Sequence, residues 1–341
     1  GTQQSTNWGG GLFTGALAAS QAAATSVLGY CTVANCPASR VTTTAAAIDI
    51  KEDRFTTWNS DVNLRVNSTG GFKFEPLSNT GFSEFKAVNA ASGLLFSADC
   101  GGVTIGKDLN TGTFELNTYP DIKIAGPIRL YAYDISVRSN LETTGSGSEI
   151  RMQATHRIYV GASKSLNTNN GNIVAWTNSE KVAGTTLIDG AIYIENNVNI
   201  LTTGGKIWFG GGLDDGGADA SITADRGKWS SVQAGDGLPD GYAVGHVINN
   251  AWRAGIFINT NTRLYSAGGD IFMAGAEAPN SYDGFGHIAF YPGVTVDSGT
   301  GRIAFWAKAL SGSTSWSQGI DFLDYDAGGE ITISSHAPTA D

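Results

Sequence analysis

Residues 190–212, GAIYIENNVNILTTGGKIWFGGG, hold the pattern that decides the fold of this chain. Ile192-Tyr193-Ile194 and Ile207-Trp208-Phe209 each place aliphatic or aromatic residues two positions apart, which is typical of a β-strand. The first isoleucines of the two runs are 15 residues apart. Thr203-Gly204-Gly205 lies between the runs and predicts a turn. The stretch therefore predicts two short strands joined through a sharp corner.

The same 15-residue spacing recurs through the second half of the chain. The isoleucine pairs are Ile135 and Ile150, Ile158 and Ile173, Ile192 and Ile207, Ile256 and Ile271, and Ile288 and Ile303. A sixth, shorter unit begins at Ile320 and ends at Ile331 and Ile333. Four of the units also carry an apolar residue eight positions after the first isoleucine, and these are Leu166, Ile200, Leu264 and Val296. In the first unit, Leu141 stands two positions early. Such recurrence predicts one repeating supersecondary unit per turn of a solenoid.

The variable length of the repeat is concentrated at one place. The unit starts are 23, 34, 64, 32 and 32 residues apart, so one copy is expected to be missing or degraded between Ile194 and Ile256. Polar insertions follow the second strand of four units, at 177–189, 210–250, 274–286 and 307–319. Because insertions leave at a single corner of a constant core, we predict an all-β parallel β-helix with inward apolar ladders. A β-propeller is the alternative, and the irregular spacing argues against it.

The sequence divides into three regions. Residues 1–40 are rich in small residues and predict an N-terminal arm or cap. Residues 41–120 are β-rich and are candidates for the first turns of the solenoid. Residues 121–341 hold the repetitive β-helix.

Composition excludes several classes of protein. The 341 residues include 46 glycines and only 15% charged residues, which is unlike a helical protein, and 41% hydrophobic residues are too many for an unfolded chain. The net charge of −10 argues against a nucleic-acid partner. No run reaches the roughly 20 apolar residues that a membrane span requires. The start at Gly1, without an initiator methionine, predicts an exported protein that is extracellular or on the cell surface.

Cys31 and Cys36 are close enough in sequence to form a disulfide, but the pairing of Cys31, Cys36 and Cys100 stays open.

Two stretches carry a resemblance to a known class. Residues 190–212 and residues 237–271, the latter beginning GLPDGYAVG, resemble the repeats of filamentous-haemagglutinin-like bacterial exoproteins, the β-strand-repeat surface adhesins. The resemblance covers about residues 100–335. It implies a secreted, right-handed β-helix with an adhesive or fibrous role, and it brings no shared catalytic motif. This chain departs from the class in being short and in showing no N-terminal secretion-domain signature.

Aspartates in the largest insertion are the candidates for metal ligands. They are Asp214, Asp215, Asp219, Asp236 and Asp240. Glycines between carboxylates are typical of calcium loops, so calcium is the only cofactor that the sequence suggests. Solvent-exposed loop carboxylates are the ordinary alternative. A catalytic carboxylate pair is the second alternative, and it requires a rigid face that loops so rich in glycine do not offer.

Aromatic residues gather near the corner that carries the insertions. Trp208 and Phe272 occupy equivalent positions between inward residues, so strand alternation points both outward. We predict that they form a surface aromatic patch able to stack on sugar rings or on another molecule. The alternative is that the aromatic side chains cap the core beneath the insertions.

Together these features predict a secreted, non-enzymatic structural and adhesive protein. Its rigid β-helical rod is expected to assemble end to end by strand pairing into a homo-oligomer or an extracellular filament, and to contact a glycan or cell-surface ligand. The alternatives are a polysaccharide lyase or glycoside hydrolase of β-helix type, and a carbohydrate-binding or ice-binding module. An ice-binding surface would require a regular threonine ladder, and serines interrupt the series Thr143, Thr168 and Thr203.

Overall fold

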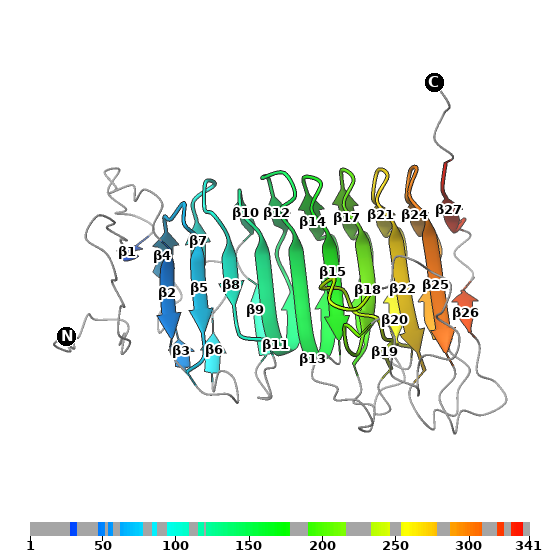
Figure 1. The fold of residues 1–341 in the computed structure, drawn as a ribbon, viewed down its shortest axis with the longest axis horizontal. Coiled ribbons are helices and arrows are strands. Elements are labelled where there is room, and N and C mark those ends of the chain that lie inside the picture. The colour runs from blue at the N-terminus through cyan, green and yellow to red at the C-terminus, as the bar shows by residue number, and fades with distance from the viewer. Residues whose placement is uncertain are drawn as a thin grey trace.

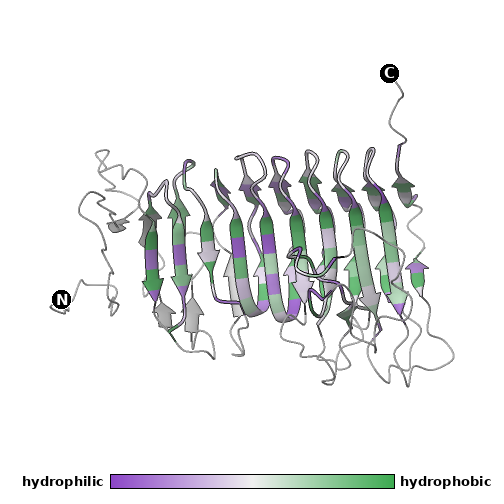
Figure 2. Ribbon diagram, in the orientation of Figure 1, coloured by the Kyte–Doolittle hydropathy of each residue, from purple (hydrophilic) through white to green (hydrophobic). Residues whose placement is uncertain are grey.

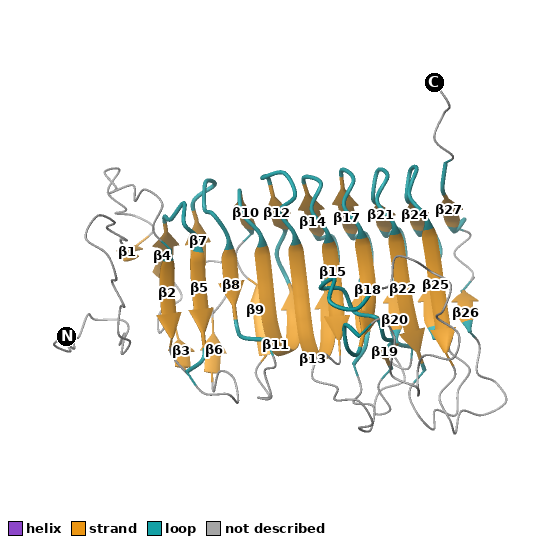
Figure 3. Ribbon diagram, viewed as in Figure 1, coloured by secondary structure: helices purple, strands orange, loops and turns teal. Residues whose placement is uncertain are grey.

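The computed structural model describes residues 28–32, 47–51, 54–56, 62–77, 84–86, 94–108, 115–118, 121–177, 190–215, 233–245, 254–277, 287–308, 319–323 and 329–336. Strands and the loops between them make up this described part, which contains no helix (Figure 3). Most of the strands are parallel and stack side by side along the long axis of the molecule (Figure 1). The all-β prediction is confirmed for the described residues.

One sheet of 15 strands forms the larger part of the stack. We call its main path the long arm, which consists of β2 (Ile48–Lys51), β5 (Phe72–Glu75), β8 (Val103–Ile105), β11 (Ile128–Val137), β13 (Ile150–Val160), β15 (Ile173–Thr177), β18 (Ile207–Gly211), β22 (Ile271–Ala276) and β25 (Ile303–Lys308). β19 (Ala243–Val244) pairs with β22 at the edge of this arm. The second halves of β11 and β13 continue into a short arm with β9 (Glu115–Thr118), β16 (Ile192–Ile194), β20 (Ile256–Ile258), β23 (Ile288–Phe290) and β26 (Ile320–Phe322).

A second parallel sheet of seven strands completes each turn. Its strands are β10 (Ile122–Ile124), β12 (Leu141–Thr143), β14 (Ser165–Thr168), β17 (Asn199–Thr202), β21 (Arg263–Tyr265), β24 (Thr295–Asp297) and β27 (Thr332–Ser334). Near the N-terminus, β1 (Leu28–Thr32), β4 (Val62–Val66) and β7 (Leu94–Phe96) form a three-stranded sheet, and β3 (Arg54–Thr56) pairs with β6 (Glu84–Lys86). In that small sheet β1 runs antiparallel to β4.

The isoleucine spacing corresponds to ladders of paired residues. Ile158, Ile192, Ile256 and Ile288 pair in succession along the short arm, and Ile150, Ile173, Ile207 and Ile271 do so along the long arm. These side chains are fully buried in one continuous core. The predicted pairing of the repeats is confirmed, because the equivalent isoleucines of successive turns lie opposite one another in both ladders.

Two details of the repeat were wrong. Ile192 pairs directly with Ile256, so no turn is missing between them, and the long gap is an insertion within one turn. Ile331 and Ile333 were expected at the end of a sixth unit, where the fifth unit has Ile303 and Phe305, but Ile333 pairs with Val296 in the seven-stranded sheet. A count of residues cannot separate a degraded turn from an insertion, since both lengthen the spacing equally.

One corner is formed by glycines that stack on each other's backbone. A Cβ added to Gly205 would lie 2.0 Å from the carbonyl oxygen of Gly171, and one added to Gly269 would lie 2.0 Å from that of Gly205. Beside them, the hydroxyls of Thr168 and Ser298 donate to the carbonyl oxygens of Gly171 and Gly301 at 2.6 Å each. Thr143, Thr168 and Ser298 of the hydroxyl series are buried, and they close corners instead of forming a surface. Thr203 is exposed, and the buried Thr202 pairs with Thr168 in its place.

The strands of residues 41–120 pair with those of the repetitive region. Ile48, Phe72, Val103 and Ile128 lie in register along the long arm. The boundaries at residues 40 and 120 stay predictions, and most of residues 1–40 lie outside the described ranges. Within the described residues, no helix has the length and apolar character needed to cross a membrane.

Candidate functional site

The outer face of the long arm is divided into a polar half and an aromatic half. On β11 and β13 the outward positions carry Arg129, Tyr131, Arg151 and Gln153. From β15 onward the outward positions carry apolar and aromatic side chains, which are Val174, Trp176, Trp208, Phe272 and Trp306. Figure 2 shows this change from hydrophilic bands on β11 and β13 to hydrophobic strands at β22 and β25. Because the core occupies the inner face, the outer residues are available for another role.

The aromatic half is covered by residues 233–245. Trp208 and Phe272 stack with ring centroids 4.3 Å apart, and Trp306 meets Phe272 edge-on at 4.9 Å. The indole N–H of Trp208 donates to the carbonyl of Pro239 at 2.9 Å. Leu238, from the same covering segment, is buried in this second apolar cluster. The cluster is thus a small core of its own on the outside of the sheet.

This cover corrects the predicted surface patch. Trp208 and Phe272 do point away from the central core, but each is 0% exposed. The alternative interpretation, in which the aromatic side chains are buried beneath the insertions, holds for these two residues. Strand alternation gives the direction of a side chain and says nothing about what covers it.

The aspartates of the insertion are engaged with the backbone of the covering segment. Asp214 accepts hydrogen bonds from the N–H groups of Gly235 at 2.6 Å and Gly237 at 2.7 Å. Asp236 accepts from Leu238 N–H at 2.9 Å, and burial, followed by the nearby Asp214 carboxylate, raises the pKa of Asp236.

The remaining calcium candidates do not complete a site in the described part. Asp240 is fully buried, and Asp219 lies outside the described residues. Asp215 lies beside Asp214 in sequence, at the end of the described range 190–215. Among the described residues, no three His, Cys, Asp or Glu side chains form a group suited to a metal ion. Calcium binding by this insertion stays a prediction.

The polar half centres on Glu149, which lies between two arginines. Arg129 Nε donates to Glu149 Oε1 at 2.7 Å, and Arg151 Nη2 lies 3.1 Å from Oε2. Burial favours the neutral acid, but the guanidinium groups of Arg151 and Arg129 outweigh it and hold the pKa of Glu149 below its usual value. The carboxylate therefore stays ionised, which suits a fixed charge better than a general acid.

Further polar groups continue this surface toward the N-terminal end. Gln153 donates to Asp108 at 2.6 Å. Burial raises the pKa of the Tyr131 phenol, which interacts with the charges of Arg151 and Asp108. On the other side, the Arg151 guanidinium lies 5.9 Å from the ring centroid of Trp176. Arg151 therefore joins the polar half to the aromatic half.

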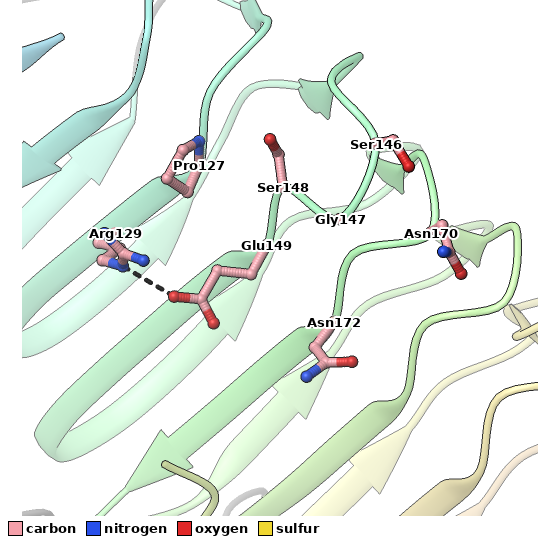
Figure 4. Close-up of a pocket in the computed structure, with 8 residues that line it drawn as sticks. All are labelled: Pro127, Arg129, Ser146, Gly147, Ser148, Glu149, Asn170 and Asn172. Carbon is pink, nitrogen blue, oxygen red and sulfur yellow. Dashed lines mark hydrogen bonds and ion pairs between the residues drawn. The ribbon is translucent and has the colours of Figure 1, made fainter. Parts of the chain in front are cut away.

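A depression of about 470 Å³ adjoins the Arg129–Glu149 pair. Its lining comes from three successive turns, namely Pro127 and Arg129, residues 146–149, and Asn170 and Asn172. Figure 4 shows these side chains around the space between the corner loops, with Arg129 bonded to Glu149 at its edge. The lining is mainly polar, with hydroxyl, amide and charged groups.

A buried histidine of the same strands has a structural explanation. His156 Nδ1 lies 2.8 Å from Asp134 Oδ1, and the same oxygen accepts from the backbone N–H of Arg157 at 3.2 Å. Tyr133 stacks on the imidazole at 4.8 Å. The register of β11 and β13 shifts between Ala132 and Asp134, so these groups satisfy polar atoms at a β-bulge.

Sequence reasoning missed Arg129, Glu149 and Arg151. The available signal was the position of Leu141, which shows that one corner is longer than the others. Charged residues at outward strand positions beside that corner are notable in a chain with 15% charge.

No family model, curated protein or solved structure matches the chain. The resemblance to filamentous-haemagglutinin-like exoproteins therefore remains an expectation from the sequence.

Proposed function

We propose that this chain is a secreted structural and adhesive protein. In this proposal the stacked strands form a right-handed parallel β-helix with its loops at one corner, and the resulting rod assembles end to end into extracellular fibres. The observation that carries the proposal is the last described turn. Ile320, Phe322 and Ile333 are 36%, 52% and 41% exposed, whereas the residues that precede them in the same ladders are fully buried.

The exposed ladder ends suit a partner with the same architecture. In the described part, β25, β26 and β27 each have a neighbour on one side only. The exposed apolar side chains of β26 and β27 favour pairing with another set of parallel strands, because such pairing continues the core. A second copy of this chain supplies such strands and matches the spacing of the turns, so we take it as the occupant.

Assembly is tested by negative-stain microscopy and sedimentation over a range of protein concentrations. Phe322→Asp places a charge on the exposed ladder, and Asn199→Asp places the same charge at an exposed position in β17, in the middle of the stack. We expect filaments or rods that lengthen with concentration for the wild type and for Asn199→Asp, and single short rods for Phe322→Asp. Single particles of wild type at every concentration would contradict the proposal, as would unchanged assembly of Phe322→Asp.

The polar half of the long arm favours a carbohydrate-binding module as the second candidate. Its hydroxyl, amide and guanidinium groups are those that bind sugars, and they lie on the strands of the long arm and on the corners beside them. Glycan-binding and polysaccharide-cleavage screens separate a binding surface from a polysaccharide lyase or glycoside hydrolase. Binding without cleavage supports the non-enzymatic role, and cleavage overturns it.

A further inference from the structure

The depression beside Arg129 arises from a change in the length of one corner. Between the seven-stranded sheet and the long arm, six residues separate Ile122 from Ile128, and nine separate Leu141 from Ile150. In each of the next four turns the same separation is seven, as from Leu166 to Ile173. The longer corner projects beyond its neighbours, so a hollow opens where the regular stack is interrupted.

The projecting corner is open to solvent at its tip. Gly147 has φ +76°, and a Cβ added there would meet nothing within 4 Å. Regular corners lack this space, since a Cβ on Gly171 would lie 1.9 Å from the carbonyl oxygen of Ser148. Among the turns that the structure describes, the nine-residue separation belongs to this turn alone. The volume of the hollow, about 470 Å³, lies within the range of small-molecule sites.

The charge at this place differs from that of the whole molecule. Two guanidinium groups, those of Arg129 and Arg151, meet the single carboxylate of Glu149 in a chain whose net charge is −10. Arg129 uses only Nε for Glu149, and the described residues provide no hydrogen-bond partner for its two terminal nitrogens. Its side chain is 42% exposed at the edge of the hollow. A guanidinium held on one edge presents the other edge to a ligand carboxylate.

The rest of the lining suits hydroxyl groups. Asn172 accepts the backbone N–H of Lys206 through Oδ1 at 2.9 Å, which fixes the side chain and leaves its NH₂ group to donate. Asn170 has φ +62°, a conformation that asparagine tolerates, and its side chain lies above Gly204. Ser146 adds a hydroxyl from the projecting corner. Side-chain amides and hydroxyls both donate and accept, as sugar hydroxyls do.

We propose that this depression binds an acidic saccharide, with a uronic-acid carboxylate on the terminal nitrogens of Arg129 and sugar hydroxyls on Ser146, Asn170 and Asn172. The proposal names a ligand class for the adhesive part of the proposed function and rests on it. Glu149 holds Arg129 in position from below, while Pro127 gives the hollow an apolar edge. An apolar ligand does not suit a lining of this polarity.

Binding is measured by titration calorimetry with oligogalacturonate, oligoglucuronate and a neutral galactose oligomer of equal length. We expect both acidic oligomers to bind and the neutral oligomer to bind about tenfold more weakly or not at all. Arg129→Met should weaken acidic binding about tenfold. Asn170→Gly should weaken it about threefold, because glycine keeps the same backbone conformation and removes only the amide.

The matched control is Lys123→Met, which removes one positive charge from an exposed ion pair with Glu142 on the seven-stranded sheet. It should bind acidic oligomers as the wild type does. If Lys123→Met and Arg129→Met weakened binding equally, the loss of affinity would come from the overall charge of the protein, and the proposal would be wrong. The proposal would also be wrong if neither acidic oligomer bound. Microscopy shows whether Arg129→Met still forms filaments. Filaments that form without binding acidic oligomers show that the saccharide site has been lost while the structural role is kept.

Discussion

A methyl group has no room at the glycine corner. Successive turns approach so closely there that a Cβ added to Gly205 or Gly269 would lie 2.0 Å from the carbonyl oxygen of the glycine in the turn before it. Strand pairing holds the turns about 4.8 Å apart, so the backbone cannot retreat to admit a side chain. Glycine is required at Gly205 by close approach, whereas at Gly147 it is favoured by its positive φ alone.

We predict that Gly205→Ala lowers the free energy of unfolding by about 3 kcal/mol or more, because its Cβ would lie 2.0 Å from the Gly171 oxygen. Gly147→Ala, where the added Cβ meets nothing, should lose about 1 kcal/mol through backbone strain. Urea denaturation followed by circular dichroism gives both values. Equal losses at the two positions would contradict the close-approach argument.

The ionisation of Glu149 makes the stability of the fold depend on pH. Since Arg151 and Arg129 hold its folded-state pKa below the usual 4.5, the folded state favours the ionised form more than the unfolded state does. The stabilisation is therefore present above pH 4.5 and is lost as the pH falls through the folded-state pKa.

We predict that the wild type is more stable than Glu149→Gln near about pH 7, and that its advantage shrinks below about pH 4.5. Denaturant melts at a series of pH values measure the difference. Glu142→Gln, at an exposed ion pair with Lys123, is the control and should change stability little at any pH. A wild-type advantage that is constant with pH would show that the arginines do not act through the Glu149 charge.

The segment 233–245 covers the outside of the sheet and then joins the edge of the long arm through β19. It rests on the outer face of β18 and β22 through Leu238 and Tyr242, and its apolar cluster is distinct from the central core. Ala243 is the residue of this segment that belongs to the central core, whose ladders are otherwise formed by the long arm, the short arm and the seven-stranded sheet.

We predict that Leu238→Asp releases this segment without unfolding the stack. Leu238 is buried against the aromatic cluster, and an aspartate there would leave a buried charge without compensation. Tryptophan emission should shift to longer wavelength and the segment should become sensitive to protease, with the far-ultraviolet circular dichroism unchanged. Ala234→Asp, at an exposed position of the same segment, should behave as the wild type. Loss of the β-sheet signal in Leu238→Asp would mean that the two cores form one cooperative unit.

The elements differ in how far the sequence determines them. The paired isoleucines were predictable because inward positions recur at a fixed spacing within each turn. The cover over Trp208 was not predictable, since the hydrogen-bond partner of its indole, Pro239, lies 31 residues away in an insertion without a repeat. The Arg129–Glu149 pair joins two adjacent turns across 20 residues, and a single strand gives no sign of it. Local periodicity thus predicts the ladders, while contacts across insertions and corners require the assembled stack.

At the scale of the whole molecule, stability should vary along the axis. In a stack, each turn is stabilised mainly by its two neighbours, so a turn with one neighbour is the first to open. The central ladders are fully buried from β13 to β23, and the exposed side chains of β26 and β27 mark the weaker end. End-to-end assembly would supply the missing neighbour.

We therefore predict that hydrogen exchange depends on both position and concentration. In dilute protein, amides of β15, β18 and β22 should exchange slowest, and those of β26 and β27 fastest. At concentrations that give filaments, β26 and β27 should become protected while the central strands change little, because only the terminal turn gains a partner. Phe322→Asp should keep the dilute pattern at every concentration. Uniform protection in dilute protein would mean that the turns unfold as one unit, and protection of β26 unchanged by assembly would place the contact between copies elsewhere on the rod.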